Sequence, residues 1–183
     1  YGSKGWIGQQ FIDLLNKNSI QFCVGECRID NVNHLKHELE KFQPTHVISL
    51  IGRTHGKIGN QVFSTIDYLE ESGKLTENVR DNLYSPFLLS FLCKEKDIHY
   101  SYLGTGCIFD YDDKHPYGKE VNGFKEDALP NFFGSSYSIV KGFTDQIMHL
   151  YKDSVLNLRI RMPITESNNP RNFIAKITKY EKI

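Results

Sequence analysis

The sequence lacks any excess of charge of one sign. Its 22 lysine and arginine residues balance its 22 aspartate and glutamate residues, so the formal net charge is zero. Proteins that bind nucleic acid or an anionic membrane surface by electrostatic attraction usually carry a basic excess. We therefore expect neither nucleic acid nor a membrane among the partners of this chain.

Long hydrophobic runs are also missing. The apolar segments HVISLIG and PFLLSFLC are far shorter than the roughly 20 residues that cross a bilayer. The sequence shows no signal-peptide pattern, no internal repeat and no low-complexity tract. Hydrophobic residues make up 39% and charged residues 24%, which is ordinary for a soluble globular protein, and 183 residues can form one domain with a core.

Cysteine is scarce and irregularly spaced. The four cysteines form no CxxC pair, which in a chain of this length indicates reduced, cytoplasmic thiols and not a disulfide framework. Cys23, Cys27 and Cys93 fall in apolar segments, so we expect them to be buried in the core. The two histidines of NHLKHELEKF have no third ligand near them in sequence, so no metal site is expected.

Helical and strand periodicities alternate along the chain. Strands are predicted at residues 20–26 (IQFCVGE), 45–52 (THVISLIG), 99–104 (HYSYLG) and 154–162 (SVLNLRIRM). Helices are predicted at residues 4–17, 32–42, 74–95, 135–151 and 170–182. This alternation is typical of βα units and a parallel sheet.

Two features interrupt this pattern. Pro86 lies inside the predicted 74–95 helix and is expected to bend it. Residues 110–133 are polar and rich in Gly, Pro and Asp, and a long loop of this kind beside a strand end is usually functional. Residues 55–66 form a loop to which the sequence assigns no role.

The chain opens on a glycine pattern, YGSKGWIG. Gly2, Gly5 and Gly8 are spaced as in a nucleotide-binding βα turn and lead into a helix. Such glycines allow a tight turn, a close approach of a pyrophosphate to the backbone, and close packing of helix and strand. An ordinary tight turn is the alternative, because the preceding strand would have Tyr1 as its last residue.

The helix that contains SSYSIVKG carries Tyr137 and Lys141 on one face. A lysine held near a tyrosine lowers the pKa of the phenol, which would suit a general acid for a carbonyl group under reduction. One such pair is expected by chance, so a surface helix pair is an equal alternative. Thr105 at a strand end and Asn82 on the long helix precede this pair in the chain and favour the catalytic interpretation.

These features, in this order, resemble the Asn, Ser/Thr, Tyr and Lys tetrad of the extended short-chain dehydrogenase/reductases. The segments TGCIFDYD, FKEDALPNFFGSSYS, LRIRMPI and NNPRNFIAKITKYEK further resemble the bifunctional 3,5-epimerase/4-reductases of the UDP-rhamnose synthase type, which are similar to dTDP-4-dehydrorhamnose reductases. The resemblance spans nearly all 183 residues.

The resemblance implies an α/β fold, a three-layer doubly wound Rossmann domain with a parallel sheet. The first strand and most of the C-terminal substrate domain are expected to be lacking, with a gap between residues 20–26 and 45–52. Residues 1–166 would form the NADP-binding domain and residues 167–183 the start of the substrate-binding part. We expect the 183 residues alone to be inactive and poorly stable.

The implied activity is the NADPH-dependent conversion of a nucleotide-linked 4-keto-6-deoxy-glucose to the L-rhamnose nucleotide. Thr105, Tyr137 and Lys141 would carry the reduction at C4. Cys107 would remove protons at C3 and C5, because a thiol near a cation is a suitable base. Lys176 would return protons on the opposite face.

The resemblance also implies binding residues. Those expected to bind the cofactor are Gly2, Gly5, Trp6, Ile7, Gly8, Arg28, Gly52, Asn82, Tyr137 and Lys141. Those expected to bind the nucleotide sugar are Asn131, Arg171 and Asn172. Arg28 would meet the 2′-phosphate of NADP, although Glu26 nearby would suit NADH.

Other activities stay open. A 4,6-dehydratase typically follows the threonine with an Asp-Glu pair, whereas Gly106 and Cys107 stand there in this chain. A plain 4-keto sugar-nucleotide reductase without epimerase activity and a non-catalytic NADP-binding regulatory subunit are the remaining alternatives. The sequence does not distinguish uridine from thymidine nucleotides, and a homodimer is possible.

Overall fold

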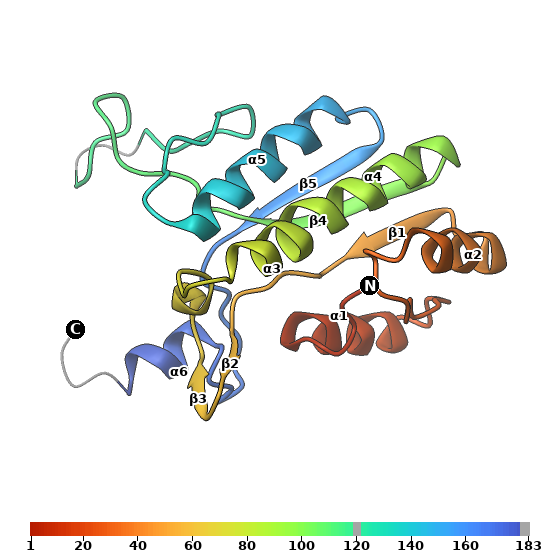
Figure 1. Cartoon of the computed structure of the whole chain (residues 1–183), viewed down its shortest axis with the longest axis horizontal. Coiled ribbons are helices and arrows are strands. Elements are labelled where there is room, and N and C mark those ends of the chain that lie inside the picture. Colours follow the sequence, from red (N-terminus) through yellow and green to blue (C-terminus); the bar gives the residue numbers. More distant parts are fainter. Residues whose placement is uncertain (119–121, 180–183) are drawn as a thin grey trace.

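The computed structural model describes residues 1–118 and 122–179. Its main sheet has three parallel strands in the order β1-β4-β5. They are β1 (His46–Ser49), β4 (His99–Thr105) and β5 (Val155–Ile160). A separate antiparallel hairpin, β2 (Gly56–Ile58) and β3 (Gln61–Phe63), lies beyond the carboxyl end of β1 (Figure 1). The α/β architecture with a parallel sheet is as predicted.

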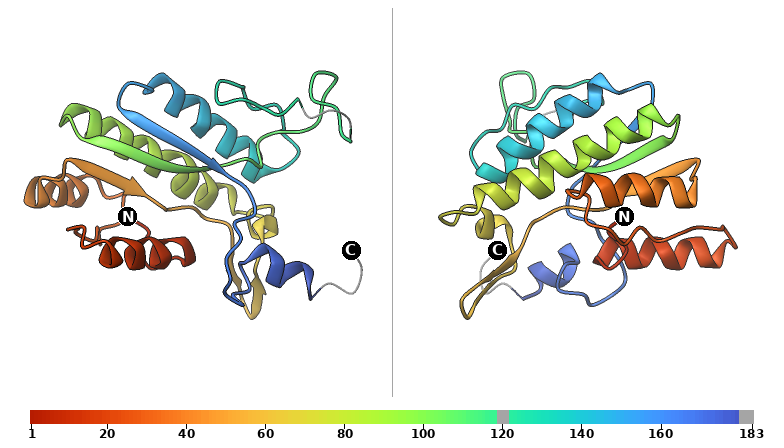
Figure 2. Two further views of the ribbon diagram at one scale, coloured as in Figure 1. Left: turned by 180° about the vertical axis from the view of Figure 1, so that it is seen from behind. Right: turned by 45° about the vertical axis from the view of Figure 1, so that its right-hand side comes forward.

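Helices fill most of the remaining chain. They are α1 (Trp6–Lys17), α2 (Val32–Phe42), α3 (Leu75–Val79), α4 (Ser85–Glu95), α5 (Ser136–Leu150) and α6 (Phe173–Ile177), with a 3-10 turn η1 (Ile66–Leu69) and a π-helical turn η2 (Arg80–Tyr84). Figures 1 and 2 show α4 and α5 side by side on one face of β4 and β5. The other face of β5 carries Leu156 and Leu158, which are 49% and 39% exposed.

The core lies between the sheet and α4. Leu89 and Leu92 of α4 pack with Tyr100 and Tyr102 of β4, and all four are at most 1% exposed. Alternate residues of β4 point into this core, as the period of a strand requires. Leu35 of α2 extends the same cluster past the edge of the sheet.

The predicted 74–95 helix is present but divided. A π-helical turn, η2, separates α3 from α4, and Pro86 stands in the first turn of α4. Proline has no N–H to donate to the preceding turn, so the extra residue of a π turn accommodates it at low cost. The hydroxyl of Ser85 donates to the carbonyl of Arg80 at 2.9 Å and satisfies part of the altered backbone.

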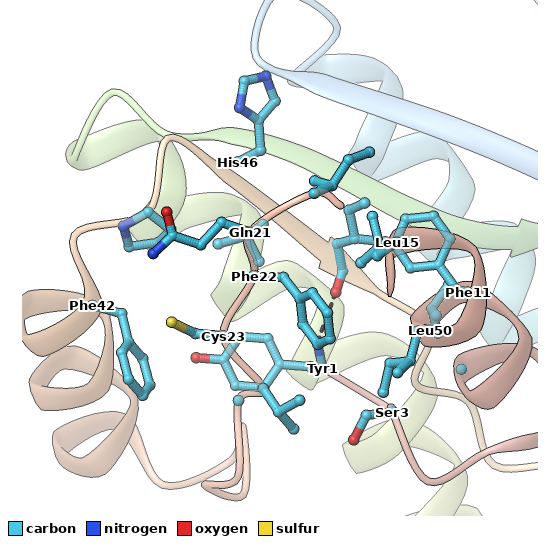
Figure 3. A pocket seen from close by; sticks show the side chains of 18 of the residues that line it. Tyr1, Ser3, Phe11, Leu15, Gln21, Phe22, Cys23, Phe42, His46 and Leu50 are labelled. Carbon is cyan, nitrogen blue, oxygen red and sulfur yellow. Dashed lines mark hydrogen bonds between the residues drawn. The ribbon is translucent and has the colours of Figure 1, made fainter. Parts of the chain in front are cut away.

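The strand predicted at residues 20–26 is not formed. Between this segment and β1 lies a cavity of about 610 Å³, whose lining includes Phe22, Cys23, Val47 and Leu50 (Figure 3). An extended segment needs a hydrogen-bonded neighbour to become a strand, and the cavity stands where that neighbour would lie. The predicted gap is therefore present, and it explains the missing strand.

Tyr1 lines this cavity and contacts β1. Its amino group donates to the carbonyl of Ile48 at 2.8 Å, and its carbonyl accepts from the amide of Leu50 at 3.0 Å. This is the hydrogen-bond pattern of a residue in a parallel strand beside β1. Cys23, which also lines this cavity, is exposed, so the prediction that it is buried was wrong, while Cys93 is buried and Cys27 is partly buried.

A buried ion pair attaches the long loop to the sheet. Arg159 of β5 donates to both carboxylate oxygens of Asp145 on α5, at 2.8 and 2.7 Å, and their side chains are 14% and 3% exposed. The same guanidinium donates to the carbonyls of Lys125, Glu126 and Ala128. One side chain thus holds a helix, a strand and the loop that leads toward α5.

We expect Arg159→Met to lower the free energy of unfolding by about 3–5 kcal/mol, because it leaves the buried carboxylate of Asp145 without its cation. Arg161→Met on the same stretch is the matched control, since Arg161 is exposed, and is expected to change stability by less than about 0.5 kcal/mol. Urea denaturation measures both. Equal effects of the two substitutions would contradict the structural role of Arg159.

Among the residues that the structure describes, no helix is both long and apolar enough to cross a membrane. Within residues 1–118 and 122–179, no three His, Cys, Asp or Glu side chains gather in a way that could hold a metal ion.

Candidate functional site

The glycine turn forms as the N-terminal lead into α1. Gly2 has a φ of +82°, a left-handed conformation that favours glycine, and its carbonyl accepts from the amide of Gly5 at 3.0 Å. A Cβ atom on Gly8 would lie 2.2 Å from the carbonyl oxygen of Gly2. Gly2 therefore supplies the tight turn, and Gly8 supplies the close packing of the helix against it.

The first turn of α1 faces a second, smaller cavity. The helix begins after Gly5 without a side-chain cap and without an acidic residue in its first turn. Its free amides and positive dipole end are suited to an anion. The adjoining cavity has a volume of about 310 Å³, and four predicted cofactor residues line it, namely Gly2, Gly5, Arg28 and Gly52. Trp6 and Ile7 lie in the first turn of α1, while Gly8 borders the larger cavity beside β1.

Arg28 is engaged with carboxylates. It donates to both oxygens of Asp30, at 2.9 and 3.1 Å, and lies 3.6 Å from a carboxylate oxygen of Asp81. The hydrogen bonds that Arg28 donates to Asp30 raise the pKa of Arg28, so the guanidinium stays charged. Its side chain is 61% exposed, which leaves part of the guanidinium accessible from the cavity.

Arg53 is a cavity residue that the sequence analysis missed. Its guanidinium donates to Asp81 at 2.9 Å, and Arg80 donates to the same carboxylate at 2.8 Å. Burial raises the pKa of Asp81, but the hydrogen bonds from Arg80 and Arg53 outweigh it and the pKa is lowered. Arg53 follows directly on the apolar strand segment THVISLIG, and a charged residue at a strand end was the available signal.

Asn82 supports the cavity wall from behind. It is fully buried in the π-helical turn, accepts from the amide of Arg53 at 2.8 Å and donates to the carbonyl of Arg53 at 2.9 Å. It also donates to Asn78, which in turn donates to Ser136 of α5. Asn82 thus holds the loop that lines the cavity, and its contact with a cofactor stays a prediction.

Thr105 and Cys107 lie together at the carboxyl end of β4. The hydroxyl of Thr105 accepts from the amide of Cys107 at 3.1 Å, and Thr105 is 8% exposed. Ser138 of α5 donates to the carbonyl of Cys107 at 2.7 Å and joins this turn to the helix. The thiol of Cys107 packs beside a small cluster formed by Tyr68, Leu69 and Tyr137. The structure thus brings these two predicted residues beside the predicted catalytic helix.

Tyr137 stands in the first turn of α5 and is 6% exposed. Burial raises the pKa of its phenol to about 12, although a hydrogen bond with Thr105 acts in the opposite direction. The sequence predicted a lowered pKa, and this prediction was wrong for the structure because burial dominates. A phenol with a raised pKa keeps its proton at neutral pH, as a proton donor must.

Lys141 is buried one helical turn after Tyr137 and is 4% exposed. Its ammonium group donates a short hydrogen bond to the hydroxyl of Tyr102 on β4. Burial lowers the pKa of Lys141 to about 8, although Asp145 and Cys107 raise it. The lysine therefore meets β4 through a phenol that the sequence analysis did not identify.

Glu70 is a second residue that the sequence analysis missed. Its carboxylate accepts from the amides of Ser136 and Tyr137, at 3.0 and 3.3 Å, and so caps the N-terminus of α5 from outside the helix. A carboxylate at a helix N-terminus is stabilised by the helix dipole. Nothing in the sequence indicates this contact, because the two segments lie 66 residues apart.

The predicted substrate residues differ in accessibility. Asn131 uses its amide on the backbone of Asp110, and Asn172 is 3% exposed and caps α6. Both side chains make hydrogen bonds within loop structure, and their contact with a substrate stays a prediction. Arg171 is exposed, and its guanidinium lies 2.8 Å from His55. Of the three residues predicted to bind the substrate, Arg171 is therefore the one with an exposed side chain.

Lys176 lies on α6, half-buried, beyond the carboxyl ends of the strands and next to the β2–β3 hairpin (Figures 1 and 2). The contact between Arg171 and His55 ties this segment to the chain that follows β1. The described hydrogen bonds of Lys176 are those of the helix backbone. The structure does not bring its ammonium group into contact with Cys107.

We expect Gly8→Ala to lower the free energy of unfolding by about 1–3 kcal/mol, because its Cβ would overlap the carbonyl oxygen of Gly2 and the turn would have to open. Gly5→Ala is the matched control, since its Cβ would lie 3.3 Å from the same oxygen. It is expected to cost less than about 0.5 kcal/mol. Thermal or urea denaturation compares the two, and an unchanged stability of Gly8→Ala would rule out the packing role.

Comparison with known proteins gives a consistent result. The chain is 50% identical over 183 residues to the L780 UDP-rhamnose synthase of Acanthamoeba polyphaga mimivirus, and the structures agree with a TM-score of 0.91. It is 39% identical over 184 residues to the trifunctional UDP-glucose 4,6-dehydratase/UDP-4-keto-6-deoxy-D-glucose 3,5-epimerase/UDP-4-keto-L-rhamnose-reductase RHM1 of Arabidopsis thaliana. The predicted resemblance is confirmed. No family model matches the chain.

The matches cover all of this chain but only part of each relative. The chain spans 61% of L780 and 26% of RHM1. A dTDP-4-dehydrorhamnose reductase from Bacillus anthracis, solved in complex with NADP, has a TM-score of 0.73 at 15% identity, covering 97% of this chain and 57% of that one. At this identity the likeness shows the fold alone, and it confirms the Rossmann-like architecture.

Proposed function

We propose that the chain carries the cofactor-binding and catalytic part of an NADPH-dependent nucleotide-sugar epimerase/reductase. Its reaction would convert a nucleotide-linked 4-keto-6-deoxy-glucose to the L-rhamnose nucleotide by epimerisation at C3 and C5 and reduction at C4. The observation that carries the proposal is the gathering of Thr105, Cys107 and Tyr137 where β4 meets α5. The relationship to UDP-rhamnose synthase supports it.

The residues around the smaller cavity fit a dinucleotide. The glycine turn and the uncapped first turn of α1 suit a pyrophosphate, and Lys4, Arg28 and Arg53 bring positive charge to the same cavity. NADPH, when bound, supplies the hydride for the reduction. Arg28 is the proposed partner of its 2′-phosphate, for which Asp30 and Asp81 now compete.

Reduction of a ketone also needs a proton at the carbonyl oxygen. We propose Tyr137 as its donor, because the phenol is protonated at neutral pH and lies beside Thr105. The hydroxyl of Thr105 can donate to the same oxygen and orient the carbonyl. Lys141, charged below a pH of about 8, would stabilise the phenolate that remains after proton transfer.

Epimerisation needs a base and an acid on opposite faces of the sugar ring. The protons at C3 and C5 are acidic because the C4 ketone stabilises the carbanion as an enolate. Cys107 is the proposed base. Its thiol packs beside Tyr137, and it lies close enough to Lys141 to raise the pKa of that lysine, so a cation stands near the thiol. Lys176 is the proposed acid, and the position of α6 beyond the same end of the sheet supports it.

The test uses the full-length protein that contains this chain, with a UDP-linked 4-keto-6-deoxy-glucose and NADPH. Oxidation of NADPH together with a rhamnose product supports the proposal. Oxidation with unchanged C3 and C5 configuration favours the plain 4-reductase, which has no use for Cys107. Tight NADPH binding without turnover favours the regulatory subunit, which has no use for Thr105, Tyr137 and Lys141 together.

A further inference from the structure

The buried hydroxyl of Tyr102 has no place in the proposed chemistry, yet it contacts a residue that does. Tyr102 lies on β4 and is 1% exposed. Its oxygen accepts the hydrogen bond from the ammonium group of Lys141, which lies 4.7 Å from the centre of the Tyr102 ring. Lys141 is itself 4% exposed, so both partners are removed from water.

We propose that Tyr102 is the positioning residue for Lys141: its hydroxyl holds the ammonium group of the lysine at the wall of the site formed by β4. The proposal rests on the proposed function for the role of Lys141 in catalysis, but the contact itself stands on the geometry. Tyr102 lines neither of the two cavities described above and is not a catalytic residue.

The surroundings of Lys141 make this contact significant. The charged and titratable groups that face it are Asp145 on its own helix, Cys107 from the turn after β4, and the phenols Tyr102 and Tyr137. Asp145 is already bound by Arg159 from β5, which balances its charge. A buried ammonium group without a hydrogen-bond acceptor is costly, so the oxygen of Tyr102 stabilises the charged lysine.

The contact also places the ammonium group of Lys141 on a phenol other than Tyr137, whose pKa is raised overall. The ammonium group bonds to one phenol, Tyr102, and the pKa of Tyr137 is set by burial and by Thr105. Burial raises the pKa of Tyr102 well above its ordinary range, so this phenol remains neutral. Tyr102 thus acts as a neutral acceptor that fixes where the positive charge lies in the site.

A matched pair of substitutions tests this. Tyr102→Phe removes the oxygen and keeps the ring. Tyr100→Phe makes the same change two residues away on β4. The side chain of Tyr100 is 0% exposed, and its hydroxyl makes no hydrogen bond of good geometry, although Ser49 lies near it. Of the two, only Tyr102→Phe removes the hydrogen-bond acceptor of the charged Lys141.

The expected result is a pH-dependent loss of stability in Tyr102→Phe. The folded pKa of Lys141, about 8, is below its ordinary value of 10.5. At pH 6 the lysine is charged in both the folded and the unfolded chain, so the missing acceptor destabilises the folded state and raises the unfolding equilibrium constant by about tenfold. As the pH rises through about 8, the folded lysine loses its proton and the difference from wild type shrinks.

Two further measurements decide the interpretation. The pH-dependent difference is expected to be absent in Tyr100→Phe, and absent when Tyr102→Phe is made in a Lys141→Met background. In the full-length enzyme, turnover of Tyr102→Phe is expected to decline on the alkaline side about one pH unit earlier than in wild type.

The stability measurements need no catalytic activity, so they test the role of Tyr102 independently of the proposed function. A loss of stability that is independent of pH, or that persists in the Lys141→Met background, overturns the role of Tyr102. The expected stability pattern in a protein without reductase turnover supports the contact and contradicts the proposed function.

Discussion

Replacing Tyr137 by phenylalanine in the full-length protein is expected to reduce NADPH oxidation by at least about 100-fold while NADPH binding stays within about twofold. The phenol is needed only as the carbonyl oxygen gains charge, so its loss should appear in turnover and not in the affinity for the cofactor. The Phe ring keeps the packing against Tyr68 and Leu69. Stopped-flow or steady-state absorbance with the 4-keto sugar nucleotide measures the rate, and fluorescence titration measures the binding.

Tyr117→Phe is the control for this substitution. Tyr117 is 78% exposed in the loop before α5, and its loss is expected to leave both measurements unchanged. If Tyr137→Phe kept most of its turnover, the proton donor would have to be another group, and the hydroxyl of Thr105 would be the first candidate.

In heavy water, the wild-type protein is expected to place deuterium at C3 and C5 of its product, and Cys107→Ser is expected to lose this exchange. Epimerisation trades sugar protons with solvent, whereas reduction at C4 leaves C3 and C5 untouched. Serine keeps the shape of cysteine but has a far higher pKa, so it cannot serve as the base. Mass spectrometry of the sugar nucleotide, with NMR to locate the deuterium, measures the exchange.

Cys23→Ser separates this effect from a general loss of thiols. Cys23 is exposed beside the cavity at β1 and is expected to leave exchange unchanged. Cofactor binding through the glycine turn is expected to survive in both variants. Exchange at wild-type rates in Cys107→Ser would remove the thiol from the mechanism and leave a plain 4-reductase as the better hypothesis.

The order of helices and strands was predictable because apolar periodicity reports burial. The β4 segment and α5 were found in this way, and with them the meeting of Thr105, Cys107 and Tyr137. The segment 20–26 was predicted as a strand and is not one, because strand formation depends on a neighbour and not on local preference alone. The β2–β3 hairpin lies in the loop to which no role was assigned.

The site was predictable in its residues but not in its electrostatics. Spacing placed Tyr137 and Lys141 on one face of a helix, yet burial and Tyr102 decide the pKa values, and both depend on tertiary packing. Asn131 illustrates the same limit, because its side-chain amide is hydrogen-bonded to the backbone of Asp110, 21 residues away. Residue type indicated a polar contact, and only the folded chain shows with which partner.

The cavity beside β1 has a consequence for how the chain behaves in solution. β1 is bonded to β4 on one side, while on its other side the described residue that pairs with it is Tyr1, through Ile48 and Leu50. An unpaired strand edge with an apolar lining is a template for any extended segment that reaches it. We therefore expect the state of the chain to depend on its concentration. Water would hydrate the edge in dilute solution, whereas extended segments of neighbouring molecules would compete for it in concentrated solution. Solubility, more than melting temperature, would report how completely this cavity is closed.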